Sequence, residues 1–150
     1  MSLTKSKTRL YFFSLLIFSI PLLAQEEYFS CNTTKGVATL GVEDNRLVYR
    51  MAGAKGNFEF SSNPPAYSKF FYNHYSRFQT DYLTISFING EYKYSIFSNY
   101  EDNKEEQGVA VFNAKSKKEY RYNCIKTKTD NLSDLSSKLQ CDKESALGCQ

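Results

Sequence analysis

The stretch YLTISFINGEYKYSIF, residues 82–97, contains two strand-like runs separated by a turn signal. Both runs are rich in β-branched and aromatic side chains, which favour strands. The Asn89-Gly90 dipeptide between them is a strong hairpin signal, because these residue types adopt positive φ readily. In the first run Leu83, Ile85 and Phe87 share one face, since side chains alternate along a strand. The stretch therefore predicts an antiparallel hairpin with one face in a core.

A second hairpin is predicted around Asp44-Asn45, which lies between the runs VATLGV and RLVYRM. Further strand-like runs follow one another without a helical interval and cover residues 28–31, 57–60, 68–78, 108–113 and 119–126. The acidic stretch NYEDNKEEQG, residues 99–108, is predicted to be a long exposed hairpin loop. The predicted fold is mainly β, an antiparallel β-barrel or compact β-sandwich of about eight strands.

The first 24 residues differ in composition from the rest of the chain. Lys5, Lys7 and Arg9 precede the apolar run YFFSLLIFSIPLLA, which has the charge and length of a secretory signal peptide. We predict cleavage after Ala24, no stable membrane anchor after processing, and a periplasmic or secreted product. All 16 acidic residues follow residue 24, whereas three of the 19 basic residues precede it, so the mature chain is formally neutral. A neutral domain lacks the positive charge on which nucleic-acid affinity mostly rests, so no nucleic-acid partner is expected.

Four cysteines lie in the mature chain, and an even number in an exported protein predicts two disulfides. Three connectivities exist for Cys31, Cys124, Cys141 and Cys149. We expect Cys31 to pair with Cys124, which ties the ends of the strand-rich region, and Cys141 with Cys149, which closes a short loop. Neither a C-x-x-C pair nor a histidine cluster is present, so no metal site is predicted.

The pattern changes near the C-terminus, where leucines recur at helical spacing in residues 132–139. One short helix is predicted near residues 131–140, followed by the disulfide-closed tail CDKESALGC. The predicted organisation is therefore a signal peptide over residues 1–24, an antiparallel β domain over residues 25–128, and a helix and tail over residues 129–150 packed on the same domain.

The sequence contains no recognisable catalytic motif. Residues 36–43, GVATLGVE, lack the lysine that a phosphate-binding loop needs, and no G-x-S-x-G or H-E-x-x-H motif occurs. His74, in the stretch KFFYNHYSRFQ of residues 69–79, is the single histidine of the chain. We interpret it as a structural or interface residue and expect neither enzymatic activity nor a cofactor.

Aromatic residues are the feature in excess: 20 of the 24 Phe and Tyr side chains follow residue 24, and the chain has no tryptophan. Tyrosine carries a hydroxyl that needs water or a partner, so many of these rings are expected at an open face. Such faces commonly bind proteins, because immobilising a rigid aromatic ring costs little entropy. The predicted partner-binding residues are Tyr75, Arg77, Tyr92, Lys93 and Tyr94.

The segment NGEYKYSIF, residues 89–97, resembles the Gly, aromatic and Lys hairpin motif of periplasmic lysozyme inhibitors of the C-type class. Tyr92, Lys93 and Tyr94 match that motif, whereas the family's Ser-Gly segment has no counterpart here. In general plan the exported, disulfide-clamped β domain also resembles periplasmic immunity proteins of toxin systems. The resemblance implies a module that blocks the active-site cleft of a cell-wall hydrolase or toxin, with Lys93 or Arg77 as the inserted charge.

Two other functions fit the same sequence. A β-barrel whose Phe-rich face lines a cavity would bind a lipid or another small molecule. A hydrolase using His74 as a general base is the other alternative.

Overall fold

A computed structural model describes residues 25–64 and 66–150 of the chain. The predicted signal peptide, residues 1–24, lies outside the described residues. Ten strands and one 3₁₀ turn follow in the order β1 (Glu26–Thr33), β2 (Val37–Glu43), β3 (Arg46–Gly53), β4 (Gly56–Ser61), β5 (Phe71–Arg77), β6 (Thr80–Asn89), β7 (Tyr92–Glu101), β8 (Lys104–Asn113), β9 (Lys118–Asp130), η1 (Leu132–Leu135) and β10 (Gln140–Cys141).

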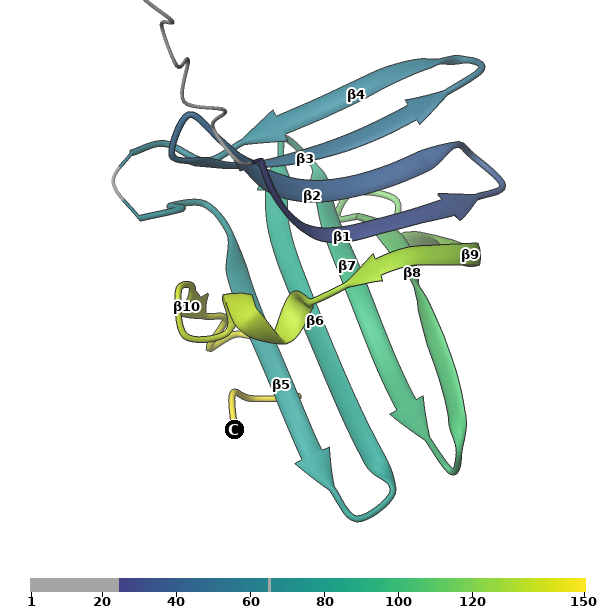
Figure 1. The fold of residues 1–150 in the computed structure, drawn as a ribbon, viewed down its shortest axis with the longest axis vertical. Coiled ribbons are helices and arrows are strands. Elements are labelled where there is room, and N and C mark those ends of the chain that lie inside the picture. Colours follow the sequence, from purple (N-terminus) through teal and green to yellow (C-terminus); the bar gives the residue numbers. More distant parts are fainter. Residues whose placement is uncertain (1–24, 65) are drawn as a thin grey trace, which may run out of the picture.

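All ten strands belong to one sheet with the order β10-β5-β6-β7-β8-β9-β1-β2-β3-β4. The sheet curls so that β1 to β4 cross over β5 to β8, which gives a half-barrel (Figure 1). The prediction of a mainly β fold is confirmed, but the strand count of about eight was too low. The sequence missed the two-residue strand β10, which pairs in parallel with β5.

Strand β9 joins the two layers of the half-barrel. Its first part, from Lys118 to Asn123, pairs with β8, and the part from Cys124 onward pairs with β1. At the junction Cys124 forms a disulfide with Cys31, and the second disulfide joins Cys141 to Cys149. The expected connectivity is therefore confirmed, and the two disulfides are compatible with an oxidising, exported location.

The two predicted hairpins both form, although one turn lies a residue further along than the sequence suggested. Asp44 and Asn45 have φ values of 48° and 59°, as a two-residue turn of the type I′ class requires. In the second hairpin Asn89 pairs with Tyr92, so the turn residues are Gly90 and Glu91. Of these two, only Gly90 has positive φ, which fits a type II′ turn with glycine at its first central position.

The acidic segment 99–108 is not a long loop. Strand β7 continues to Glu101 and β8 begins at Lys104, so Asp102 and Asn103 alone form the turn, with φ values of 49° and 64°. The sequence interpretation was wrong because the side chains of β7 and β8 near this turn are exposed or half-buried, and exposed strand residues can be polar on both faces.

The predicted helix over residues 131–140 is reduced to the 3₁₀ turn η1. Leu132 and Leu135 are fully buried beneath the sheet, which explains the leucine spacing. Asn131 provides no side-chain cap, and the chain must return to the sheet at β10, so a longer helix does not form. The disulfide-closed tail then lies along β5: the backbone N–H of Asp142 donates to the carbonyl of Tyr72 at 3.0 Å, and that of Gln150 to the carbonyl of His74 at 2.9 Å.

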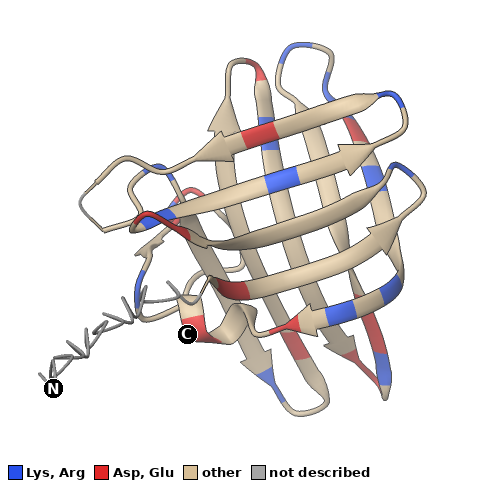
Figure 2. Ribbon diagram, turned by 45° about the horizontal axis from the view of Figure 1, so that its top comes forward, with Lys and Arg blue, Asp and Glu red and all other residues tan. Residues whose placement is uncertain are grey.

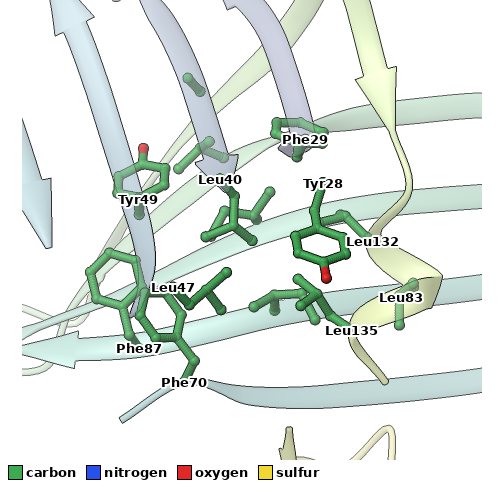
Figure 3. Close-up of a cluster of buried hydrophobic side chains, with 14 of the residues drawn as sticks. Tyr28, Phe29, Leu40, Leu47, Tyr49, Phe70, Leu83, Phe87, Leu132 and Leu135 are labelled. Carbon is green, nitrogen blue, oxygen red and sulfur yellow. The ribbon is translucent and has the colours of Figure 1, made fainter. Parts of the chain in front are cut away.

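The core lies on the concave side of the curled sheet and contains the predicted Leu83, Ile85 and Phe87. Side chains from β1, β2 and β3 meet those of β6 and η1 there (Figure 3). Phe87 is at the centre of an aromatic cluster, with ring centroids 4.2 Å from Phe60 and 4.9 Å from Tyr94. This packed cluster fills one part of the half-barrel and forms the floor of the pocket described below.

Candidate functional site

The most exposed aromatic side chain of the described residues is Phe78, at the tip of the β5–β6 hairpin. Arg77 pairs with Thr80, so Phe78 and Gln79 form the turn. The Phe78 side chain is 88% exposed. The β5–β6 and β7–β8 hairpins extend beyond the layer formed by β1 to β4 (Figure 1). The tip is therefore open to a partner from several directions.

Contacts within and between the two hairpins brace this tip. The rings of Tyr75 and Tyr82 stack with their centroids 6.2 Å apart, and the Arg77 guanidinium lies 5.9 Å from the centroid of Tyr75. The backbone N–H of Asp102 donates to the carbonyl of Gln79 at 3.0 Å, which ties the β7–β8 turn to the β5–β6 turn. Such bracing lowers the entropy cost of presenting Phe78 to a partner.

The neighbouring β7–β8 hairpin is mainly acidic at its tip (Figure 2). The tip segment, residues 101–106, contains one basic side chain, Lys104, and four acidic ones, Glu101, Asp102, Glu105 and Glu106. Arg121 binds the carboxylate of Glu106 at 3.0 Å. The pKa of the Tyr82 hydroxyl is raised, mainly by a hydrogen bond with Glu101. The hydroxyl is therefore protonated at neutral pH and can donate a hydrogen bond. The surface beside Phe78 thus favours a partner with a basic rim.

The predicted partner-binding residues separate into two groups. Tyr75 lies opposite Tyr82 and Tyr92 lies opposite Asn89, and these two positions of β6 are seven residues, or about 23 Å, apart. Tyr75 and Arg77 therefore belong to the hairpin tip, whereas Tyr92, Lys93 and Tyr94 lie at the other end of the sheet.

Each member of the second group has a different environment. The Lys93 ammonium binds the carboxylate of Asp142 at 2.6 Å, so its charge is already paired within the protein. Tyr94 stacks between Phe58 and Phe87, with centroid distances of 4.8 and 4.9 Å. Tyr92 is 40% exposed. The structure therefore does not bring this group together as one surface, because neighbouring residues of a strand point to opposite faces.

His74 is held between two acceptors of the protein. Its Nε2 atom lies 3.1 Å from both carboxylate oxygens of Asp81, and its Nδ1 atom lies 3.0 Å from the carbonyl oxygen of Gln150. With both ring nitrogens engaged, the imidazole fixes the C-terminal segment against β5. This geometry gives His74 a structural task.

A pocket of about 250 Å³ opens on the concave side, between the β3–β4 hairpin and strands β7 to β9. Its lining is mainly apolar and aromatic, with two lysines at the turns, and consists of Lys35, Tyr49, Met51, Lys55, Gly56, Phe58, Tyr94, Val111 and Tyr122. The Tyr49 hydroxyl points away from the buried cluster (Figure 3). Burial, followed by the neighbouring Tyr94, raises the pKa of Tyr49, and burial also raises the pKa of Tyr94. Both hydroxyls therefore remain protonated and able to donate.

Two turns come into close contact at the rim of this pocket. Gly36 has a φ of 147°, and a Cβ atom at this position would lie 2.1 Å from the carbonyl oxygen of Ala52. A Cβ atom at Gly53 would lie 2.2 Å from the carbonyl oxygen of Lys35. The two glycines thus allow the β1–β2 turn, with Lys35, to lie against the β3–β4 hairpin that carries Lys55.

Gly36→Ala is expected to lower the free energy of unfolding by about 1–3 kcal/mol, because the added methyl group overlaps backbone atoms. Urea unfolding of the oxidised protein measures the change. Gly56→Ala is the matched control: Gly56 also has positive φ, 130°, but a Cβ atom there meets nothing within 4 Å. Equal losses in both variants would attribute the effect to backbone conformation and contradict the role of the close contact.

Sequence reasoning missed Phe78, Lys35 and Lys55. Phe78 was placed within a strand, although the break between two strand-like runs at residues 78–79 could have indicated a turn. The two lysines directly precede Gly36 and Gly56 in short polar segments. Such segments indicate that each lysine lies in a turn, but they do not indicate that the two turns contribute to one site.

No three His, Cys, Asp or Glu side chains of residues 25–64 and 66–150 lie close enough together to hold a metal ion. In the same residues no helix has the length and apolar character needed to cross a membrane.

Comparison with known proteins adds no relative: no family model, curated protein or solved structure matches the chain.

Proposed function

We propose that the chain is an exported, periplasmic protein-binding module that inhibits a cell-wall hydrolase or neutralises a toxin by blocking its active-site cleft. The β5–β6 tip is the inserted element, with Phe78 as the anchor and Arg77 and Tyr75 as flanking contacts. The observation that carries the proposal is the 88% exposure of Phe78 on a braced turn. The proposal assigns the chain no catalytic step and no cofactor.

Three features support insertion of this tip. A two-residue turn is narrow enough to enter a cleft, and its strands continue into a disulfide-stabilised sheet. An aromatic side chain that enters a partner's pocket is a typical hot spot of a protein interface. The acidic β7–β8 tip beside it would attract the basic rim expected of an enzyme that binds anionic cell-wall polymers.

The structure changes which residues the proposal emphasises. Arg77 remains available at the tip, whereas Lys93 would first have to leave Asp142 before it could enter a cleft. The role of Tyr92, Lys93 and Tyr94 stays a prediction, and it belongs to a separate surface.

Phe78→Ala combined with Arg77→Ala is expected to weaken binding of the partner by about 30-fold or more, as loss of a hot spot does. The partner is first recovered with the oxidised wild-type protein from envelope and secreted-toxin fractions, identified by mass spectrometry, and tested for inhibition of its hydrolytic activity. Affinities are then measured by surface plasmon resonance for the wild type and the variants.

Ile125→Ala is the matched control, because Ile125 is 72% exposed but lies on β9, away from the tip. It should leave the affinity unchanged. A Lys93→Ala variant tests the other group of predicted residues. Unchanged affinity of the tip variant, or loss of affinity in the Lys93 variant alone, would contradict insertion of the β5–β6 tip.

A further inference from the structure

The concave pocket has the features of a small-molecule site that is independent of the hairpin tip. Its apolar surface comes mainly from Met51, Phe58 and Val111. The stacked pair Phe58 and Tyr94, with an interplanar angle of 8°, rests on Phe87 and forms a rigid wall. The pocket wall is thus formed by residues that are packed against the core.

Two tyrosine side chains, Tyr49 and Tyr94, present hydroxyl groups at this pocket. Tyr49 is 1% exposed, and within residues 25–64 and 66–150 no hydrogen-bond partner is found for its hydroxyl or for that of Tyr94. No side-chain nitrogen or oxygen of the described residues is both buried and unpaired, so the Tyr49 and Tyr94 hydroxyls are accessible groups that are free to bond to a ligand. Since the pKa of each tyrosine is raised, both groups can donate to an acceptor that enters the pocket.

The charged groups of the pocket have one sign. Lys35 and Lys55 line it, and no carboxylate does. In the part of the chain that the structure describes, neither lysine forms a salt bridge. The Lys35 ammonium lies 5.6 Å from the ring centroid of Tyr122, where it faces the pocket. Figure 2 shows basic segments at these turns. The side chains that line the pocket therefore offer donors and positive charge to an acceptor-rich, negatively charged group.

We propose that this pocket binds a small amphipathic carboxylate. Its hydrocarbon part contacts Met51, Phe58 and Val111, and its carboxylate accepts hydrogen bonds from the tyrosine hydroxyls and from Lys35 and Lys55. A volume of about 250 Å³ is below the usual range for drug-sized ligands, so a medium-chain acyl or compact aromatic acid fits best. This ligand is independent of the proposed protein partner, since the tip and the pocket lie at opposite ends of β6 and β7.

Isothermal titration calorimetry tests the site with the oxidised protein, expressed with its own leader so that any processing takes place. The probes are octanoate, decanoate and 2-naphthoate, with 1-octanol and octylammonium as neutral and cationic counterparts of octanoate. We expect saturable one-to-one binding of at least one carboxylate. We also expect octanol and octylammonium to bind at least about tenfold more weakly than octanoate, because only a carboxylate pairs with both lysines.

Variants locate the binding. Lys35→Ala with Lys55→Ala should weaken carboxylate binding by about tenfold, whereas Lys115→Ala with Lys117→Ala removes the same charge from the β8–β9 turn and should change it little. Tyr49→Phe keeps the ring and removes the hydroxyl, so it should also weaken binding by about tenfold.

Three results would overturn the proposal: no saturable binding of any of the three carboxylates, equal binding of octanol or octylammonium, or unchanged binding in the Lys35 and Lys55 variant. Phe78→Ala should leave carboxylate binding intact. Loss of partner binding with retained carboxylate binding, or the reverse, therefore separates failure of one proposal from failure of the other.

Discussion

Replacing Cys31 and Cys124 by alanine is expected to lower the free energy of unfolding by about 4–5 kcal/mol in the chain-entropy description of disulfide stabilisation. The bond joins residues 93 positions apart, so its removal releases nearly the whole sheet in the unfolded chain. A loss of this size approaches the total stability of many single domains, which is about 5–15 kcal/mol. Urea unfolding without reductant, followed by far-ultraviolet circular dichroism, measures the change.

The pair Cys141→Ala and Cys149→Ala is the internal control for this prediction. That disulfide closes a loop of only eight positions, so the same description gives about 2–3 kcal/mol. An equal or larger loss for the short bond would contradict the dominance of loop length and would assign the stabilisation to local contacts of the tail.

Phe87→Ala is expected to destabilise the fold by about 3–5 kcal/mol, the range typical of a buried phenylalanine. Phe87 is fully buried, and its ring centroid lies within 5.3 Å of those of Tyr49, Phe60, Phe70 and Tyr94. Truncation would leave a cavity that these interlocked rings can fill only by moving together. Thermal and urea unfolding of the variant give the loss.

Phe78→Ala is the matched control, because it makes the same truncation on a side chain that is 88% exposed. Its effect on stability should stay within about 0.5 kcal/mol. This result would also establish that the Phe78→Ala change within the tip variant leaves the fold intact. A similar loss for both variants would contradict the central place of Phe87 in the core.

The sequence predicted the strands well where one face is buried. Leu83, Ile85 and Phe87 alternate with polar residues, and these three apolar side chains are the ones that pack in the hydrophobic core. The cysteine pairing was also predictable, because Cys31 lies in the first strand and Cys124 in the last long one. These features depend on local chemistry or on the order of elements along the chain.

The parts that sequence reasoning missed depend on long-range geometry. Segment 99–108 looked like a loop because its strand residues lie at an exposed end of the sheet, where polarity no longer indicates the face. The leucines of 132–139 indicated burial correctly, but a helix period cannot show that the chain turns back to pair with β5. Lys35 and Lys55 line the same pocket because Gly36 and Gly53 let two separate turns approach each other.

The division of β9 between two partners has a consequence for how the chain reaches this fold. β1 pairs on one side with β2, which follows it immediately, but on the other side with residues 124–130 of β9. The second edge of β1 can therefore form its native hydrogen bonds only after almost the entire chain has become available. Such distant pairing gives a high contact order and slow folding. Until then the Cys31 thiol has no native partner. If it is oxidised early, the resulting disulfide must be exchangeable, so that Cys31 can later pair with Cys124.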